Sequence, residues 1–298
     1  MISIAIINEI ISQWGLTIMD IRQIVTPSMS TWQVNEEYYL KKHQDYTEAR
    51  RNIEMMFMLR KEEIPVAEYI TTLQGDFLYS DAAGGYYSLC RKALGEHRDL
   101  YVYPELAYPM GTALGKLHKA LLSIDKNVNV YESNIFKSWE DRIRPDVAEF
   151  LPLSMITSID TKLKDMIPLL EYQLIHRDVH MGNVLFDKDV LSTWLDFDIA
   201  QKNVRIFDIA YLLSGLLVGN LENPEKINIW SKIREDTIAG YHATNTLTKV
   251  EKDALDIIIV FIELLFVSYN KQRGDTAASN VALDIALWYF RFFIISLE

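Results

Sequence analysis

The spacing of hydrophobic residues changes near residue 95. Before that point, short apolar runs alternate with polar turns, which is typical of antiparallel strands joined by hairpins. The predicted extended segments are 21–25, 31–34, 38–43, 66–72 and 86–92. Isoleucines predict a short leading helix within residues 2–11, and apolar residues at helical spacing predict a longer helix at 48–61. This part of the chain is therefore predicted to form a small antiparallel sheet with one main helix.

After residue 95 the apolar spacing becomes mostly helical. The predicted helices are 110–122, 159–171, 207–217, 227–241, 252–270 and 277–297. Residues 172–198 are the exception, because their short apolar runs are flanked by polar residues, which favours strands and loops. The pattern predicts an α+β protein with a sheet-bearing lobe at 1–94 and a larger, mostly helical lobe at 95–298, joined by a hinge at 91–98.

Charge and composition narrow the classes of partner. The chain of 298 residues has 41 Asp and Glu against 30 Lys and Arg, a net charge of −11. Nucleic-acid binding needs a basic face, so this balance argues against it, whereas it is compatible with solubility or with a cationic ligand. The single cysteine, Cys90, excludes an intramolecular disulfide and is predicted to be a buried small hydrophobe.

The apolar segments do not predict a membrane protein. The N-terminal apolar stretch has no basic leader or small-residue cleavage site. The longest apolar run, 257–269, is too short to span a bilayer and contains Glu263. We therefore expect a soluble cytoplasmic protein with no membrane partner.

The segment most informative about chemistry is residues 175–186, with the sequence IHRDVHMGNVLF. It holds His-Arg-Asp, four further residues and then Asn183, and Asp196 follows thirteen residues later. Phosphoryl transfer needs a carboxylate to orient the attacking hydroxyl and oxygen ligands for Mg²⁺. One loop can supply Asp178 and Asn183 about a turn apart, and a hairpin can return Asp196 to the same place. This spacing fits a phosphoryl-transfer site.

Residues 174–187 resemble the catalytic loop of aminoglycoside phosphotransferases, choline kinases and homoserine-kinase-type enzymes. Residues 195–198, followed by 207–210, are similar to that family's metal-binding aspartate and its downstream helix start. The resemblance implies a bilobal, protein-kinase-like fold with ATP in the cleft. It implies that Asp178 is the catalytic base and that Asn183 and Asp196 hold Mg²⁺.

Two further side chains of this block have other interpretations. Asp208 opens an apolar helix, where an aspartate is favoured as an N-cap, and it could also brace the catalytic loop. His180 could touch substrate or phosphate, or it could shape the loop.

The segment after Asp198 favours a small-molecule acceptor over a peptide. Only nine residues separate it from Asp208, no Ala-Pro-Glu follows, and Asp198 replaces the glycine of Asp-Phe-Gly. We therefore predict an ATP-dependent phosphotransferase that acts on a hydroxyl of a small metabolite or aminoglycoside-like substrate, which could be cationic. The alternative is a weakly active or inactive kinase-like scaffold or nucleotide-binding protein, as in spore-coat relatives.

The resemblance also implies a lysine for the nucleotide phosphates and a helix glutamate that holds it. Lys41 ends a predicted strand on the face of Tyr39 and is chosen over the adjacent Lys42, which points to the other face. Glu54, on the following helix, is the predicted partner of the lysine, with Glu48 as the alternative.

The remaining predicted nucleotide contacts involve hairpin and hinge residues. No Gly-x-Gly-x-x-Gly run is present, and Ser28 and Ser30 occupy the hairpin position, where they could donate hydrogen bonds to phosphate oxygens. Lys92 and Leu94 follow the last strand of the first lobe and are predicted to bind adenine through their main chain. The aromatic residues of 288–293 are interpreted as core, with a cage for a quaternary ammonium as the alternative.

Overall fold

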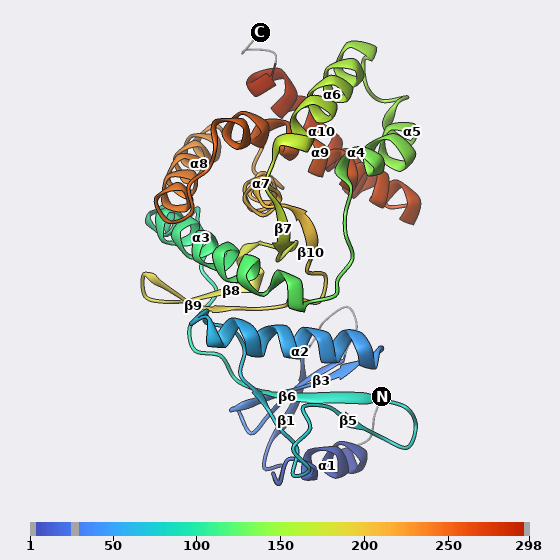
Figure 1. The fold of residues 1–298 in the computed structure, drawn as a ribbon, viewed down its shortest axis with the longest axis vertical. Helices are drawn as coiled ribbons and strands as arrows, with labels where there is room; N and C mark the ends of the chain where they lie inside the picture. Colours follow the sequence, from blue (N-terminus) through green and yellow to red (C-terminus); the bar gives the residue numbers. More distant parts are fainter. Residues whose placement is uncertain (1–3, 25–29, 295–298) are drawn as a thin grey trace.

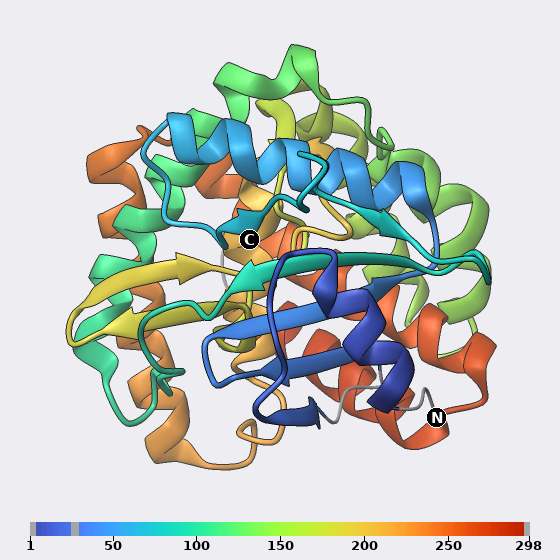
Figure 2. The same cartoon turned by 90° about the horizontal axis from the view of Figure 1, so that it is seen from below.

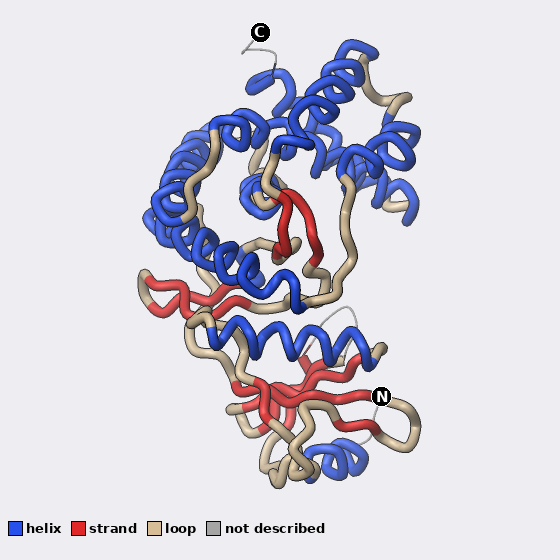
Figure 3. The backbone as a smooth tube through the Cα atoms, viewed as in Figure 1, coloured by secondary structure: helices blue, strands red, loops and turns tan. Residues whose placement is uncertain are grey.

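The computed structural model describes residues 4–24 and 30–294. A sheet-bearing part and a larger helical part lie one above the other, and the strands gather mainly in the first of them (Figures 1 and 3). The fold class predicted from the sequence is confirmed. The exact division of the chain into lobes at residues 94 and 95 stays a prediction.

The first part contains one antiparallel sheet of six strands, which differ in length. Its strands are β1 (Ile21–Ile24), β2 (Thr31–Val34), β3 (Tyr38–His43), β4 (Tyr69–Ile70), β5 (Tyr79–Ser80) and β6 (Tyr86–Arg91). The order is β1-β2-β3-β6-β4, and β5 also pairs with β6. In the register of the central strands, Lys41 lies opposite Thr31 on one side and Ser88 on the other. Lys41 is therefore anchored in the middle of the sheet.

Two helices flank this sheet. Helix α1 (Ile4–Ser12) buries Ile7, Ile10 and Ile11 against Trp32, Leu40 and Leu89 of the strands, and Figure 2 shows it in front of the sheet. Helix α2 (Tyr46–Lys61) lies between the sheet and the helical part (Figure 1). It begins at Asp45, whose side chain accepts a hydrogen bond from the amide of Glu48 at 2.7 Å.

The second part is built around one long central helix. Its helices are α3 (Ala107–Ile124), α4 (Ile135–Ser138), α5 (Arg144–Val147), α6 (Leu153–Met166), α7 (Ile206–Gly215), α8 (Pro224–Thr244), α9 (Lys249–Arg273) and α10 (Thr276–Tyr289). Helix α9 is buried over most of its length and packs against α7 and α10. Helices α3 and α8 pack closely, because a Cβ at Gly111 would lie 2.0 Å from the carbonyl oxygen of Thr237.

Four short strands carry the loops that matter for function. Strands β7 (Tyr172–Ile175) and β10 (Gln201–Val204) pair antiparallel, as do β8 (Val184–Asp187) and β9 (Val190–Trp194). One loop runs from β7 to β8 through a 3-10 turn at Met181–Asn183, and a second runs from β9 to β10. The two hairpin-like pairs therefore bring residues 176–183 and 195–200 side by side.

The predicted elements differ from the observed ones in a few places. The predicted strand at 66–72 is reduced to β4, and the helix predicted at 159–171 begins earlier and ends at Met166. Helix α9 extends beyond 252–270 because Thr248 and Glu251 form a capping box and Gly274 ends the helix in the left-handed conformation. The sequence pattern missed α4, α5 and the π-helical turn between them.

One described helical segment, Thr276–Ile294, is long and apolar enough to cross a membrane by length and composition alone. This is weak evidence for a membrane span, since core helices meet the same criterion. The segment packs against α9 and buries Ala282, Ile285 and Tyr289 in the core.

Candidate active site

The loop after β7 is held by a fully buried aspartate on α7. The carboxylate of Asp208 accepts hydrogen bonds from the backbone amides of His176 and Arg177, both at 2.9 Å. The same carboxylate lies 3.0 Å from Nε2 of His118, whose Nδ1 lies 2.7 Å from the hydroxyl of Tyr241. The N-cap of α7 is Arg205 rather than Asp208. Asp208 therefore braces the loop and is no helix cap.

Asp178 lies at the tip of this loop with several hydrogen-bond donors around its carboxylate. Nδ2 of Asn183 donates to both the main-chain oxygen and Oδ2 of Asp178, each at 2.9 Å. Nε2 of His180 lies 3.5 Å from the same Oδ2, and the hydroxyl of Tyr211 donates to the carboxylate. Partial burial would raise the pKa of Asp178, but these donors outweigh it and lower the pKa to about 2. The carboxylate is therefore ionised at neutral pH.

The loop after β9 brings Asp196 to the same region. The amide of Leu195 donates to the carbonyl oxygen of Asn183 at 2.9 Å, and the charge of Asp178 contributes to the environment of Asp196. Burial and then the neighbouring Asp198 raise the pKa of Asp196. With Nδ2 of Asn183 directed at Asp178, Oδ1 is the amide atom available to a cation. Oxygen atoms from Asn183 and Asp196 suit Mg²⁺.

No cluster of three or more His, Cys, Asp or Glu side chains that could enclose a metal is found among residues 4–24 and 30–294. This composition fits a cation held by two protein ligands together with phosphate oxygens and water. Mg²⁺ is commonly bound in that way at nucleotide sites.

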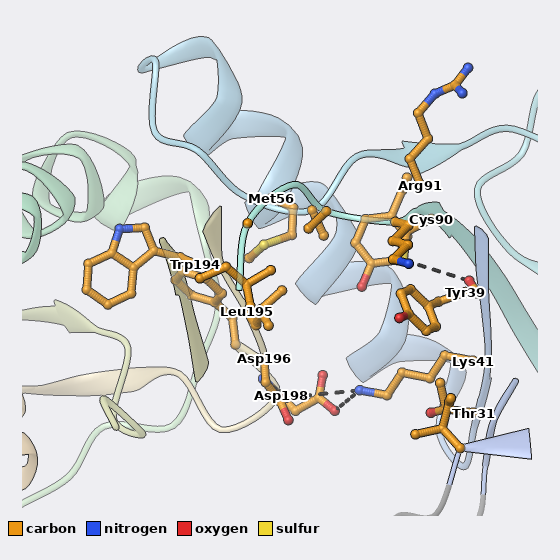
Figure 4. A pocket seen from close by; sticks show the side chains of 18 of the residues that line it. Thr31, Tyr39, Lys41, Met56, Cys90, Arg91, Trp194, Leu195, Asp196 and Asp198 are labelled. Carbon is orange, nitrogen blue, oxygen red and sulfur yellow. Dashed lines mark hydrogen bonds and ion pairs between the residues drawn. The ribbon is translucent and has the colours of Figure 1, made fainter. Parts of the chain in front are cut away.

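Lys41 reaches across from β3 to the second loop (Figure 4). Its Nζ lies 2.5 Å from Oδ2 of Asp198 and 4.0 Å from Oδ1 of Asp196. Nδ2 of Asn52, on α2, donates to the other oxygen of Asp198 at 3.1 Å. Burial lowers the pKa of Lys41, but the carboxylates of Asp198 and Asp196 outweigh it and raise the pKa. Burial raises the pKa of Asp198, and Lys41 more than offsets that and lowers it.

These groups line one end of a cavity of about 540 Å³ between the sheet and the β8–β9 pair. Its other walls include Ala67, Met56 and Leu185 together with the chain from Cys90 to His97, apart from Leu94. Lys41, Asp196 and Asp198 thus gather at one end of the cavity (Figure 4), and most of the remaining lining surface is apolar although Arg91, Lys92, Glu96 and His97 also border it. A nucleotide has the same division, with phosphates at one end and a flat apolar base at the other.

The predicted hinge contacts are only partly brought to this cavity. Lys92 lines it, but its amide already donates to the carbonyl oxygen of Glu37 at 2.7 Å. The Leu94 side chain is 80% exposed, and its carbonyl accepts from the hydroxyl of Ser192 at 2.7 Å. Ala93 and Gly95 line the cavity instead, and Gly95 has a φ of 104°, which a side chain would strain. Among residues 92–95, Lys92, Ala93 and Gly95 therefore border the cavity, and Leu94 does not.

The two serines predicted to contact phosphate lie in the β1–β2 connection. Ser28 lies outside the described residues. Ser30 is buried, and its carbonyl accepts from the amide of Lys42 at 2.8 Å. Cys90, predicted to be buried, is only partly so and lines the cavity.

The structure does not place Glu54 beside Lys41. Its carboxylate pairs with Arg50, one turn earlier on α2, at 2.8 Å on the exposed side of the helix. Asn52 and Met56 face the cavity, and a residue two positions from Asn52 points to another side of the helix. Glu48 is also exposed. The acidic partner of Lys41 is Asp198, and the helix contributes an amide.

The sequence did not single out Asn52, Tyr211 or the pairing role of Asp198. Tyr211 could have been found from helix geometry, because it lies three residues after Asp208 and so on the same side of α7. Asn52 could not, because its role depends on how α2 docks on the sheet. The C-terminal aromatic residues other than Phe292, which is 55% exposed, pack as core: Tyr289 and Phe293 each lie 5.9 Å from the ring of Trp230, and Trp288 lies 6.3 Å away.

Comparisons of sequence and of structure both match this chain to kinases and phosphotransferases. A homoserine kinase from Granulibacter bethesdensis is 29% identical over 159 residues, which is 51% of this chain and 47% of that protein. The matched part thus spans about half the length of that relative.

Solved structures of similar fold include a microcompartment-associated aminopropanol kinase (TM-score 0.72, 15% identity, 97% of both chains). They also include amicoumacin kinase hAmiN in complex with AMP-PNP, Ca²⁺ and Ami (0.71, 15%, 96% of this chain and 93% of that one). A third is aminoglycoside 2'-phosphotransferase-IIIa as its GDP complex (0.68, 13%, 96% and 97%). At these identities the likeness concerns the fold, and it confirms the predicted protein-kinase-like architecture.

A sequence model of the phosphotransferase enzyme family matches residues 27–249, three quarters of the chain and all the residues of the catalytic loop. The family predicted from the loop is confirmed. This chain belongs to the phosphotransferase enzyme family.

Proposed function

We propose that the protein transfers the γ-phosphate of ATP to a hydroxyl group of a small molecule in the cytoplasm, with Asp178 as the central catalytic residue. The observation that carries this proposal is the convergence of two loops. Asp178 and Asn183 are hydrogen-bonded to each other, Asn183 is joined through its main chain to Leu195, and Asp196 follows at the charged end of the nucleotide-sized cavity.

The nucleotide half of the site is assigned to Lys41, Asn183 and Asp196. Asn183 and Asp196 would hold Mg²⁺, which supplies neutralisation of the phosphate charge. Lys41 would contact the phosphates, and Asp198 and Asn52 would keep its ammonium group in reach of them. The base would lie against the apolar walls near Ala93. Binding there leaves the γ-phosphate pointing toward the catalytic loop.

Asp178 would orient the acceptor hydroxyl and receive its proton. A carboxylate with a pKa of about 2 is a weak base, so it does not remove the proton before transfer begins. In a loose transition state the hydroxyl loses its proton late, and a well-positioned hydrogen-bond acceptor is sufficient. The donors from Asn183, His180 and Tyr211 fix the carboxylate for this task. Positioning is thus the main contribution of Asp178.

A nucleotide-binding scaffold is the second candidate. It is favoured by one observation, the contact of Lys41 with Asp198 in place of a helix carboxylate. The presence of Asp178, Asn183 and Asp196 in one place supports the enzyme instead.

The test is release of ADP from Mg-ATP across a panel of amino alcohols, aminoglycosides, homoserine and sugars. We expect acceptor-dependent ADP release by the natural protein and a loss of about 100- to 10,000-fold in Asp178→Asn. Asp189→Asn, an exposed aspartate in the β8–β9 turn, is the matched control and should retain full activity. Nucleotide binding without transfer to any acceptor would establish the scaffold, and full activity of Asp178→Asn would refute the assigned mechanism.

A further inference from the structure

A second cavity lies beside the catalytic loop and shares no described lining residue with the nucleotide-sized one. It measures about 320 Å³ and is enclosed by α7, α9, α10 and the loop. His180 from the loop and Tyr211 from α7 line it, and both donate to the carboxylate of Asp178. An acceptor held in this cavity would therefore be next to the group that is to orient its hydroxyl.

The lining of the cavity is mostly apolar, and its polar residues are His180, Tyr211, Ser214, Asn270 and Glu263. Val218, Phe266, Val281 and Ala282 form much of its wall. Glu263, on α9, also lines it, although the residue is only 2% exposed. The hydroxyl of Ser214 donates to Oε1 of Glu263. Within residues 4–24 and 30–294, no group forms a hydrogen bond with Oε2. A buried carboxyl group with an unused oxygen beside a cavity is available to a ligand.

The described lining of the cavity supplies no basic side chain that would compensate a charge on Glu263. Among residues 4–24 and 30–294, no lysine or arginine lines the cavity. The titratable groups that face it are His180 from the loop and Tyr211 from α7, while α10 contributes only Ala278, Val281 and Ala282. Burial raises the pKa of Glu263 to about 8, and the hydrogen bond from Ser214 offsets only part of this effect. The carboxyl group is therefore largely neutral at pH 7 while the cavity is empty.

Filling space in the core does not explain why position 263 carries a glutamate. Burying a carboxyl group in an apolar site is costly, and a leucine or glutamine would fill the same volume without that cost. Such costly groups concentrate at functional sites. The position of Glu263, facing the cavity that adjoins Asp178, points to recognition of a ligand.

We propose that this cavity binds the phosphate acceptor and that Glu263 recognises a protonated amino group of that acceptor. The inference rests on the proposed function, because it assigns the acceptor of that reaction to the class of amino alcohols. The ring of Phe266, whose centroid lies 5.9 Å from that of Tyr211, supplies a face that also attracts a cation, whereas the ring of Tyr211 already has the guanidinium group of Arg177 over it at 5.8 Å. The net charge of −11 favours capture of a cation over an anion.

Binding of the ammonium group is coupled to loss of a proton. The ligand arrives already protonated, Glu263 releases its proton to solvent, and the two opposite charges then pair. Each binding event thus releases up to one proton below pH 8. The affinity for the amine rises as the pH increases toward 8, whereas the affinity for a neutral alcohol of the same shape does not.

The test is calorimetric titration of the full chain, without nucleotide, at pH 6.5 in two buffers of different ionisation enthalpy. The probes are ethanolamine, 1-amino-2-propanol and 6-amino-1-hexanol, each paired with the diol in which a hydroxyl replaces the amine. We expect at least one amine to bind about tenfold or more tightly than its diol and to release close to one proton. Glu263→Gln should remove both effects, and Asp253→Asn, an exposed carboxylate on the same helix, should change neither.

The outcomes separate this inference from the proposed function. Amine binding with proton release, together with no ADP release for any acceptor, would keep the assignment of Glu263 and refute the kinase. Equal binding of amines and diols, no binding of any amine, or unchanged proton release in Glu263→Gln would overturn the assignment of Glu263. The comparison of amine with diol uses the natural protein, so it holds even if the variant does not fold.

Discussion

The catalytic loop and the lysine of the sheet hold their charged groups in different ways. Asp208 is completely buried and joins two loop amides and His118 in one hydrogen-bonded network. Lys41 and Asp198 pair at the wall of an open cavity, where their side chains remain 31% and 45% exposed. Buried and satisfied networks fix geometry, whereas exposed ion pairs add little stability and can exchange partners. The comparison indicates a rigid loop facing a lysine that is free to move onto a nucleotide.

The largest expected effect comes from removing Asp208, the buried aspartate that holds the catalytic loop. Asp208→Ala leaves two amides of the loop and His118 without their acceptor, and we expect it to lower the free energy of unfolding by about 3 kcal/mol or more. Urea denaturation measures this change. Asp189→Ala, with an exposed side chain, is the control and should lie within about 0.5 kcal/mol of the natural protein. A loss below about 1 kcal/mol for Asp208→Ala would mean that the network does not hold the loop.

Glu263 sharpens the comparison because it is a buried carboxyl group without such a network. Its pKa is raised from 4.5 to about 8 by burial, so the folded protein keeps a proton that the unfolded chain has lost between these pH values. Unfolding then releases a proton, and the stability that this group confers is present below pH 4.5 and is lost as the pH rises to about 8.

Relative to Glu263→Gln, the natural protein should therefore lose stability with increasing pH, by at most about 1.4 kcal/mol per pH unit. Urea denaturation of both proteins at pH 5, 6.5 and 8 measures the difference. Parallel stability curves would show that Glu263 is ionised in the folded protein.

The next effect concerns Lys41, whose ion pair with Asp198 is partly exposed. Lys41→Ala should raise the KM for ATP about tenfold or more with little change in the free energy of unfolding, because the ion pair it removes is partly exposed. Steady-state kinetics with varied ATP measures this. Lys42→Ala is the matched control, since its ammonium lies over the ring of Tyr87 at 5.7 Å, away from Asp198. Unchanged KM and kcat in Lys41→Ala would show that the wrong lysine was assigned.

The smallest effect tests the partner of the lysine. Asn52→Ala removes the hydrogen bond that holds Asp198, and we expect a rise of about two- to fivefold in the KM for ATP. Glu54→Ala should leave this KM unchanged, because Glu54 pairs with Arg50 on the outside of α2. The reverse order of effects would restore the glutamate as the group that positions Lys41.

The same comparison explains which parts could be predicted from the sequence. The grouping of Asp178, Asn183 and Asp196 could be predicted because they lie at fixed spacing within two adjacent loops, and their proposed functions come from the family resemblance. For Asp208 the sequence offered two roles, a helix cap and a brace for the loop, and the structure shows the brace. The overall fold could be predicted because the change from alternating to helical spacing occurs at one point in the chain.

The remaining features depend on tertiary contacts or on the main chain. Glu54 and Asn52 share one helix, and only the docking of α2 decides which of them faces Lys41. The hinge contacts involve backbone groups, so the exposed side chain of Leu94 carried no information. The segment 135–147 was missed because a π-helical turn interrupts the helical spacing between α4 and α5. Glu263 was noticed only as a charge in an apolar run.

The most direct measurement of the central claim compares binding and chemistry in one variant. Asp178→Asn and the natural protein are titrated with Mg-ATP, and phosphate transfer to an acceptor is then followed in a single turnover. If Asp178 orients the hydroxyl beside Asn183 and Asp196, the dissociation constant for Mg-ATP should agree within about twofold while the transfer rate falls by about 100-fold or more. An equal transfer rate in the two proteins would contradict the account.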